Sequence, residues 1–343
     1  MGRTTLKSLA QALNMSVSTV SKALNDSYEI SEATKKRVRE FAKKHNYQPN
    51  VLAQSLKTGK TQTLGVVLPK MTSPFESQIL EGMQQTASQH HYRIVIMNSM
   101  EDEELEKQAL QSMLDKAVDG ILFCPIHESS NIELAGKIME DTPIVIFDRT
   151  NYALETHKIG VLNAEGTYSA CKHLLDIGRK RIAVFCGARQ GISAIRLSGY
   201  ERAHQEFDIP IDTEYIVHCN VSSISELHID MERHIERLLS LPFPPDAVVG
   251  VADTITTHLL GVLAKMGVAV PETLAVIGFA NTDLAFSLNP SLSTIRQPTR
   301  DIGEISVNKL VEVINKRHRN QITWEDIKLP TSIQFRRSTV GKA

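Results

Sequence analysis

The sequence has few of the features that mark a membrane, exported or metal-binding protein. No apolar run in its 343 residues approaches the roughly 20 residues needed to span a bilayer. The N-terminal segment lacks the apolar core of a signal peptide. Its four cysteines are scattered, with no CxxC pair and no histidine at ligand spacing, so we expect buried thiols in a reducing compartment. These absences predict a cytoplasmic protein with no membrane partner and no metal site.

Catalytic motifs are also scarce. Residues 58–61 (TGKT) end like a phosphate-binding loop, but Gln54 stands where that motif has its leading glycine. The segment also follows a short predicted helix and precedes a predicted strand, which is the wrong order for that motif. No GxGxxG follows the first predicted strand, and neither HExxH nor GxSxG occurs. The sequence therefore predicts no enzyme activity and no cofactor.

What the sequence does have is an uneven distribution of charge. The chain carries 38 Lys and Arg against 39 Asp and Glu. Eleven of the basic residues but only 4 of the acidic ones fall in residues 1–60, so this segment has a charge of +7 and the remainder −8. A basic head on an acidic body indicates that the head meets a polyanion and that the body does something else.

Apolar residues at helical spacing predict three short helices in the head. Their predicted N-caps are Thr5, Ser16 and Ser31, and Asn14 can take the left-handed conformation of a tight turn after the first helix. The buried positions predicted for the three helices are Leu6, Leu9, Ala10 and Leu13; Val17, Val20, Ala23 and Leu24; and Val38, Phe41 and Ala42. Two short helices joined by a tight turn and supported by a third are typical of a helix-turn-helix domain.

The polar side of the second helix offers groups that suit nucleic acid. Ser16, Ser18, Thr19 and Ser21 carry small hydroxyls that can approach phosphates and base edges, and Lys22 can donate to guanine in the major groove. The alternative is that these are solvated positions on a small helical bundle. The charge of the head favours the first interpretation.

Residues 47–59 predict a fourth, conditional helix. Pro49 and Asn50 can begin it and Gly59 can end it, which leaves about two turns, too few for a stable isolated helix. An apolar Leu56 beside Lys57 suits a segment that folds in the minor groove and inserts Leu56 between base steps. The alternative is a leucine that docks on the body.

The quoted motifs resemble the LacI/GalR family of bacterial transcription regulators: residues 5–25 (TLKSLAQALNMSVSTVSKALN), 47–50 (YQPN) and 53–56 (AQSL), in this order and at this spacing. The resemblance implies that Val17, Ser18 and Lys22 read bases, and that Leu56 is the minor-groove wedge. Gln54 stands where many members have arginine. The DNA-binding residues implied are Thr5, Ser16, Val17, Ser18, Thr19, Ser21, Lys22, Asn25, Ala53, Gln54, Leu56 and Lys57.

Downstream, continuous apolar segments alternate with helical patterns. The predicted strands are 63–68, 93–97, 119–123, 143–147, 158–161, 181–185, 246–251 and 274–279, with predicted helices at 75–90 and 103–116. Apolar strands of this kind are typical of parallel sheets covered on both faces. Two such series predict an α/β body of two doubly wound lobes, with ligands bound at the carboxyl ends of the strands.

The resemblance adds the connectivity of the body, a fold similar to periplasmic sugar-binding proteins. It implies three crossovers between the lobes, which we place near residues 161–163, 292–295 and 322–324, with the tail returning to the second lobe through 328–330 and 333–335. The domains expected are a helix-turn-helix domain at 1–47, a hinge helix and linker at 48–61, a first lobe at 62–162 and 293–322, and a second lobe at 163–292 and 323–340. No leucine heptads follow, so we expect a homodimer that reads a palindromic operator in double-stranded DNA.

The cleft between the lobes is expected to hold a small effector. Arg196 matches the family's ligand-clamping arginine. Phe75 can stack on a ring or simply pack its helix, and Asp148 and Arg149 can contact the ligand or form a structural ion pair. Many sugar-binding relatives carry polar residues where this chain has Ala252 and Ala280, so Asn281 and Asp283 are expected to substitute. The effector-binding residues predicted are Phe75, Asp148, Arg149, Arg196, Asp253, Asn281, Asp283 and Gln297.

Together these features predict a DNA-binding transcriptional regulator whose operator affinity is controlled by a sugar or sugar derivative. We expect this regulator to be a repressor. The alternative is a binding receptor of the periplasmic type without a DNA function, which the body alone would permit. The basic head and the missing signal peptide argue against it. Release by an inducer and recruitment by a corepressor use the same architecture, so both remain open.

Overall fold

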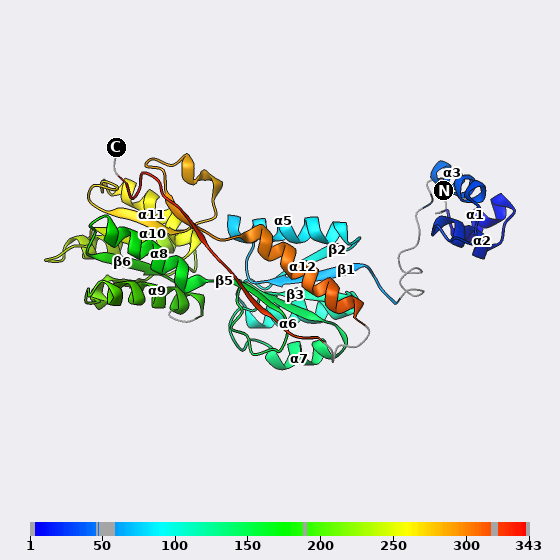
Figure 1. Ribbon diagram of the computed structural model, residues 1–343, viewed down its shortest axis with the longest axis horizontal. Helices are drawn as coiled ribbons and strands as arrows, with labels where there is room; N and C mark the ends of the chain where they lie inside the picture. Colours follow the sequence, from blue (N-terminus) through cyan, green and yellow to red (C-terminus); the bar gives the residue numbers. More distant parts are fainter. Residues whose placement is uncertain (1–3, 46, 48–58, 188–190, 317–321, 341–343) are drawn as a thin grey trace. The chain divides into compact units, whose positions relative to one another are not determined.

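The computed structural model describes residues 4–45, 47, 59–187, 191–316 and 322–340 (Figure 1). The chain divides into two compact units, residues 1–62 and residues 63–343, called here the head and the body. The predicted hinge segment lies almost entirely in residues 48–58, outside the described part of the chain.

The head contains three helices where the sequence predicts them: α1 (Leu6–Leu13), α2 (Val17–Leu24) and α3 (Glu32–Lys44). Thr5 caps α1 through a capping box with Ser8, and Ser16 and Ser31 accept hydrogen bonds from backbone amides of α2 and α3. Asn14 ends α1 in the left-handed conformation, with φ of 53°. The predicted caps and the predicted turn are therefore confirmed.

The core of the head forms where the three helices meet, and one residue predicted for it lies outside. Leu9, Val20, Ala23 and Val38 are almost completely buried. Val17, however, is 45% exposed, so its predicted place on the buried side of α2 is wrong. Helix side chains tilt toward the N-terminus, and a residue in the first turn therefore points past the end of its own helix.

The first lobe of the body is built on a six-stranded sheet, in the order β11-β5-β4-β3-β1-β2, with every recorded pairing parallel. Its strands are β1 (Thr63–Leu68), β2 (Arg93–Asn98), β3 (Gly120–Phe123), β4 (Ile144–Phe147), β5 (Lys158–Val161) and β11 (Asp326–Leu329). The helices packed with it are α5 (Pro74–Gln89), α6 (Glu103–Asp115), α7 (Ile132–Asp141) and α12 (Thr299–Asn315).

The second lobe has a sheet of the same size, in the order β12-β10-β9-β8-β6-β7. Its strands are β6 (Ile182–Cys186), β7 (Ile216–His218), β8 (Ala247–Gly250), β9 (Ala275–Phe279), β10 (Ser293–Arg296) and β12 (Ser332–Gln334). Helices α8 (Asn163–Asp176), α9 (Ile192–Glu206), α10 (Ile224–Leu239) and α11 (Asp253–Lys265) belong to it, with short 3-10 turns η1 (Thr213–Tyr215) and η2 (Asp283–Phe286). Two doubly wound lobes are thus confirmed.

Two of the three predicted crossovers are misplaced. Residues 293–296 form β10, which pairs with β9 in the second sheet, so the chain returns to the first lobe only after Arg296. Residues 326–329 form β11, which pairs with β5 in the first sheet, so the final crossover lies between β11 and β12 (Figure 1). Which sheet a short apolar strand joins depends on its pairing partner, and local sequence carries little of that information.

Each sheet of the body is covered on both faces by apolar clusters, as a parallel sheet requires. In the first lobe α5 and α12 cross very closely. A β-carbon added to Gly82 would lie 2.3 Å from the Arg300 carbonyl oxygen, and one added to Gly303 would lie 2.3 Å from the Ile79 carbonyl oxygen. The helix that begins at the cleft is thereby held tightly against its neighbour.

Candidate functional site

The exposed surface of α2 carries the polar residues predicted to meet DNA. Ser16, Val17, Ser18 and Asn25 are exposed, and Thr19 is half-buried. The hydroxyls of Ser16 and Thr19 lie 2.8 Å apart, so the cap of the helix also orients Thr19. The sequence predicted Thr5 as both a cap and a DNA contact, and the structure confirms the cap.

Acidic residues of the loop after α2 pair with the basic residues around it, which the sequence did not predict. Lys22 forms an ion pair with Glu29. The Asp26 carboxylate lies 3.1 Å from Lys35 Nζ and 2.7 Å from an Arg39 guanidinium nitrogen, and hydrogen bonds from these two side chains hold the pKa of Asp26 below its usual value. The free head therefore presents Lys22 with a competing acceptor already in place.

The remaining residues predicted to contact DNA lie outside the described part of the chain. These are Ala53, Gln54, Leu56 and Lys57. Their roles as a hinge helix and minor-groove wedge stay predictions.

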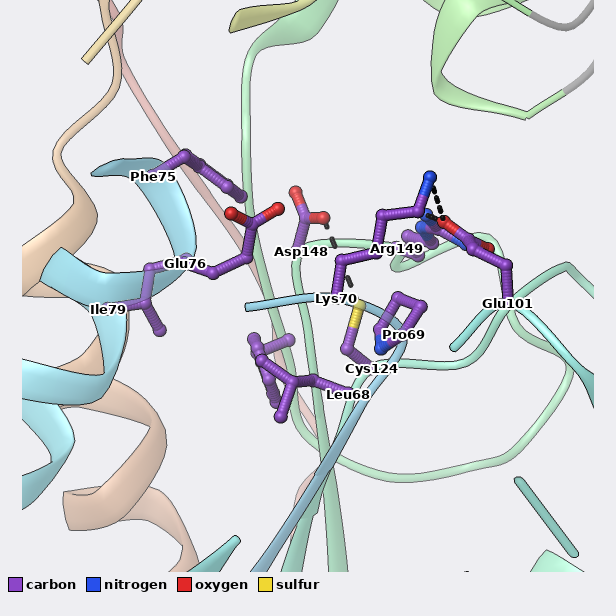
Figure 2. Close-up of a pocket in the computed structure, with 11 residues that line it drawn as sticks. Leu68, Pro69, Lys70, Phe75, Glu76, Ile79, Glu101, Cys124, Asp148 and Arg149 are labelled. Atoms are coloured by element: carbon purple, nitrogen blue, oxygen red, sulfur yellow. Dashed lines mark hydrogen bonds and ion pairs between the residues drawn. The ribbon is translucent and has the colours of Figure 1, made fainter. Parts of the chain in front are cut away.

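In the body, a cavity of about 50 Å³ opens where β1, β3 and β4 of the first lobe end (Figure 2). Phe75, Asp148 and Arg149 all line it, as predicted, together with the Glu76 carboxylate from the first turn of α5. The position agrees with the rule that open α/β sheets bind ligands at the carboxyl ends of their strands. The cavity has room for water but is far smaller than the roughly 300–1,000 Å³ of ordinary ligand sites, so it would have to widen to admit a ligand.

Asp148 is a carboxylate with almost no protein donor. Its backbone has the left-handed φ of 62°, and strained backbone of this kind concentrates at functional sites. Within the described residues its carboxylate accepts one hydrogen bond, a long one of 3.9 Å from the Cys124 thiol. Burial raises the pKa of Asp148 above its ordinary value, against the opposing pull of Arg149 and Arg196.

Arg149, by contrast, is held by protein partners. Its two terminal nitrogens lie 3.0 and 2.7 Å from the Glu101 carboxylate oxygens, and it also donates to the carbonyl oxygens of Pro125 and Ile126. Lys70 lies 3.8 Å from the same carboxylate. The structure therefore favours a structural ion pair for Arg149, but with Glu101 and not with Asp148.

Arg196 is the buried cation of the second lobe, with only 5% of its surface exposed. It donates to Asn163 Oδ1 at 2.8 Å, to the Val251 carbonyl oxygen at 2.8 Å and to Gln297 Oε1 at 2.9 Å. Its guanidinium carbon lies 3.6 Å from the centre of the Phe279 ring. Burial lowers the pKa of Arg196 to about 10, although Asp148 and Asp253 both act to raise it.

Asn281, predicted to bind the effector, is hydrogen-bonded to other residues of the protein. Its side-chain amide donates to the Gln297 carbonyl oxygen at 2.8 Å and to Gln78 Oε1 at 3.2 Å, and its side-chain oxygen accepts from Gln297 N at 3.1 Å. Gln78 in turn donates to the Asn281 carbonyl oxygen at 3.0 Å and accepts from the Thr299 hydroxyl at 2.8 Å. These buried groups satisfy one another and join α5 of the first lobe to the second lobe beside Arg196.

The two predicted aspartates of the second lobe differ. Asp253 begins α11, accepts a hydrogen bond from Asn281 N at 2.6 Å, and has a pKa raised by burial. Asp283 is exposed and pairs with Arg296 at 3.2 Å, so the structure does not bring it into the group around Arg196. Ala280, which directly follows β9, is buried in an apolar cluster.

Several groups at the cleft escaped prediction. They are Lys70, Glu76, Gln78, Glu101, Cys124, Asn163 and Thr299. Only Glu76 had a local signal, since Ser73 and Glu76 form the capping box of α5. The described residues contain no group of three or more His, Cys, Asp or Glu arranged to hold a metal ion. Within the same ranges, no helix has the length and apolar character that crossing a membrane requires.

Two family models match the chain: "Bacterial regulatory proteins, lacI family" at residues 5–50, and "Periplasmic binding protein-like domain" at residues 171–339. A ribose operon repressor of Haemophilus influenzae is 30% identical over 325 residues, which cover 93% of this chain and 94% of that protein. A transcriptional repressor PurR of Aliivibrio fischeri is also 30% identical, over 94% and 95% of the two chains.

Solved structures give the same fold. The lac repressor dimer bound to operator and an anti-inducer matches with a TM-score of 0.85 and 22% identity, covering 99% of this chain and all of that one. The complex of the regulator CelR with cellobiose matches with a TM-score of 0.71 and 23% identity, over 98% and 100% of the chains. The head and the body described above therefore have matched counterparts along their whole length, and the chain belongs to the LacI family of DNA-binding bacterial regulators with a periplasmic-binding-protein-like effector domain.

Proposed function

We propose that this protein is a homodimeric transcriptional repressor that binds a palindromic operator through α2 and loses or gains operator affinity when a sugar or sugar derivative enters the cleft. The observation that carries the proposal is the pairing, in one chain, of an exposed hydroxyl-rich helix with a cleft built around a buried arginine. Neither part alone would imply regulation.

The exposed face of α2 supports the DNA contact. Val17 and Ser18 are exposed. The core of the head is made by other residues, including Leu9, Val20 and Val38, so these two side chains are available for DNA. An apolar side chain beside hydroxyls suits the thymine methyl group and the acceptors of the major groove. Leu56 remains the proposed minor-groove wedge.

Exposed apolar side chains on the body support a dimer. Ile229 on α10 and Leu284 and Phe286 on η2 are more than 60% exposed in the second lobe, and Met100 is equally exposed in the first. Where such side chains form one continuous patch, they commonly mark a protein interface. A twofold dimer would place two copies of α2 on the two halves of a palindrome.

The cleft supports a ligand that separates two lobes. Asp148 of the first lobe and Asp253 of the second both act on Arg196, so the charges around this arginine depend on the distance between the lobes. A ligand that binds one lobe arrangement better than another shifts the equilibrium between them, and the heads linked to those lobes respond.

The test is selection of binding sites from random DNA with the full-length chain, followed by gel shift on the selected sequence. We expect a palindromic sequence bound in a salt-sensitive way. Ser18→Glu adds a negative charge at an exposed position on α2 and is expected to abolish binding without changing the melting temperature. Ser88→Glu, at an exposed position on α5, is the matched control and is expected to bind normally. Failure to enrich any sequence would refute the proposal.

A further inference from the structure

The charged groups around the cleft add up to a net negative charge. Those lining the first-lobe cavity are the cations Lys70 and Arg149 and the acids Glu76, Glu101 and Asp148. The second lobe adds Arg196 and Asp253, which act on each other, and Arg196 also acts on Asp148. These are three cations and four acids; a further cation, Arg296, also acts on Asp253 but is paired with Asp283. What decides the chemistry of a ligand is which of these groups still have capacity to bind it.

Both first-lobe cations face the same carboxylate. Glu101 takes both terminal nitrogens of Arg149, at 2.7 and 3.0 Å, and lies 3.8 Å from Lys70 Nζ. Burial raises the pKa of Glu101, but its contacts with Arg149 outweigh burial and hold the pKa below its usual value, so Glu101 stays ionised. A phosphate would have to compete with this bidentate pair before Arg149 could bind it, and near Lys70 it would meet the same ionised carboxylate.

The two remaining first-lobe acids point into the cavity with acceptor oxygens to spare. Figure 2 shows the carboxylates of Glu76 and Asp148 facing the same space beside Phe75. Glu76 uses one oxygen, Oε2, for the Ser73 amide at 3.0 Å and the Ser73 hydroxyl. Asp148 receives only the distant Cys124 thiol. Both side chains are half-buried, so their free carboxylate oxygens can accept hydrogen bonds from a ligand that replaces water in the cavity.

Arg196 does not reverse this balance. Its three nitrogens each donate to a neutral acceptor of the protein, and its charge lies in the field of both Asp148 and Asp253. An anionic group brought to Arg196 would therefore lie close to two carboxylates as well as to one guanidinium. A hydroxyl or ring oxygen can accept from the remaining guanidinium hydrogens without that repulsion.

We propose that the effector is an uncharged compound whose hydroxyl or amide hydrogens bind the Glu76 and Asp148 carboxylates, and that these two acids exclude phosphorylated and carboxylated compounds from the cleft. This rests on the proposed function, and it narrows the proposed sugar derivatives to those without an acid group. Glu76 becomes a specificity-determining residue, because it supplies the second negative charge on this wall.

The test uses matched pairs of probes and the full-length protein. The pairs are ribose and ribose 5-phosphate, glucose and glucose 6-phosphate, trehalose and trehalose 6-phosphate, and adenosine and AMP. Thermal shift is measured for each. We expect at least one uncharged member to raise the melting temperature by about 5 °C at roughly 100 times its Kd, and its phosphate ester to give no rise.

Substitution then separates charge from shape. Glu76→Gln keeps the length of the side chain and an oxygen that can still accept from the Ser73 amide, so α5 keeps its cap. We expect Glu76→Gln to weaken the binding of the uncharged ligand about 10-fold and to reduce the ratio of its affinity to that of the ester. The double variant Glu76→Gln with Asp148→Asn should reduce this ratio further. Glu81, on the same helix as Glu76, forms an exposed ion pair with Arg300 of α12. Glu81→Gln removes the same charge as Glu76→Gln and is expected to change the affinity for neither the uncharged ligand nor its ester.

Two results would overturn the inference: an ester that raises the melting temperature as much as its parent compound, or a panel in which no uncharged member binds. Gel shift with each probe keeps this separate from the proposed function. An ester that changes operator affinity contradicts the inference but supports regulation. An uncharged ligand that binds and leaves operator affinity unchanged supports the inference and contradicts regulation.

Discussion

In the head, charged side chains lie at the surface and pair with one another, whereas the arginine at the centre of the body's cleft is buried and has only neutral hydrogen-bond partners. Lys22 and Glu29 are about 40–45% exposed, and Arg196 is 5% exposed. Water and salt screen the first kind of contact and hardly reach the second. Salt should therefore weaken the binding of DNA by the head strongly and the binding of an effector by the body very little.

The largest expected difference is in salt dependence. If the dimer makes about six phosphate contacts, operator affinity should fall roughly 10³-fold between 50 and 200 mM salt, because each contact releases condensed counterions. The affinity for an uncharged effector should change less than about twofold over the same range. Fluorescence anisotropy and calorimetry on the same preparation would measure both. A flat operator curve, or a steep effector curve, would remove the distinction between the two surfaces.

Removing the buried arginine should have the next largest effect. Arg196→Met leaves the acceptors of Asn163, Val251 and Gln297 without a donor, and we expect it to lower the free energy of unfolding of the body by about 3 kcal/mol. The measurement is urea unfolding monitored by circular dichroism. Effector binding should be lost with it.

The matched control for Arg196 lies on the same helix. Arg202 forms a bidentate ion pair with Glu165, at 2.6 and 2.7 Å, with both side chains nearly half exposed. Exposed pairs contribute about 0–1 kcal/mol, so Arg202→Met should change unfolding by no more than that. Equal losses at the two positions would show that burial does not set the difference.

A smaller effect is expected from substitution of Lys22 on α2. Lys22→Ala should weaken the selected operator about 10-fold and change the base preference at one position of each half-site, because the side chain is proposed to donate to guanine. Competition gel shifts with single-base operator variants measure this. A uniform loss across all variants would instead assign Lys22 to a phosphate. Lys43→Ala, an exposed lysine at the end of α3, is the control.

The smallest effect concerns pH and separates the two kinds of carboxylate. Burial raises the pKa of Asp148, so the folded protein holds this proton more tightly than the unfolded chain, and stability falls as pH rises from about 4 through the raised pKa. Asp148→Asn should therefore raise the melting temperature of the free protein more at pH 7.5 than at pH 5. Glu101→Gln should lower it at pH 7.5, since the pKa of Glu101 lies below its usual value.

Local sequence predicted local structure well. The caps Thr5, Ser16 and Ser31 and the left-handed Asn14 depend on neighbours three or four residues away, and all four are confirmed. Eight of the twelve strands in the described residues were predicted from continuous apolar runs, and the resemblance of short motifs gave the family and pointed to Arg196.

What the sequence did not predict depends on partners that are distant in the chain. The ion pair of Glu101 and Arg149 spans 48 residues and the contact of Gln78 with Asn281 spans 203, so neither leaves a pattern within any local window. Asp283 was expected to replace a missing polar group at the cleft, but the η2 turn places it beside Arg296 at the surface. Strand β11 was assigned to the wrong lobe for the same reason, because its partner β5 lies 168 positions earlier in the chain, with Val161 opposite Leu329.

The first two turns of α5 have a consequence for redesign of this protein as a biosensor. Phe75 and Glu76 face the cavity, and Gln78, two positions on, is bound to Asn281 of the other lobe. Close packing at Gly82 leaves the helix little freedom to absorb a change by shifting along α12. Substitutions made here to accept a new compound will therefore also alter the contact between the lobes. Ligand specificity and the change in operator affinity on ligand binding would have to be selected together. One library should therefore vary the cavity residues Phe75 and Glu76 together with Gln78.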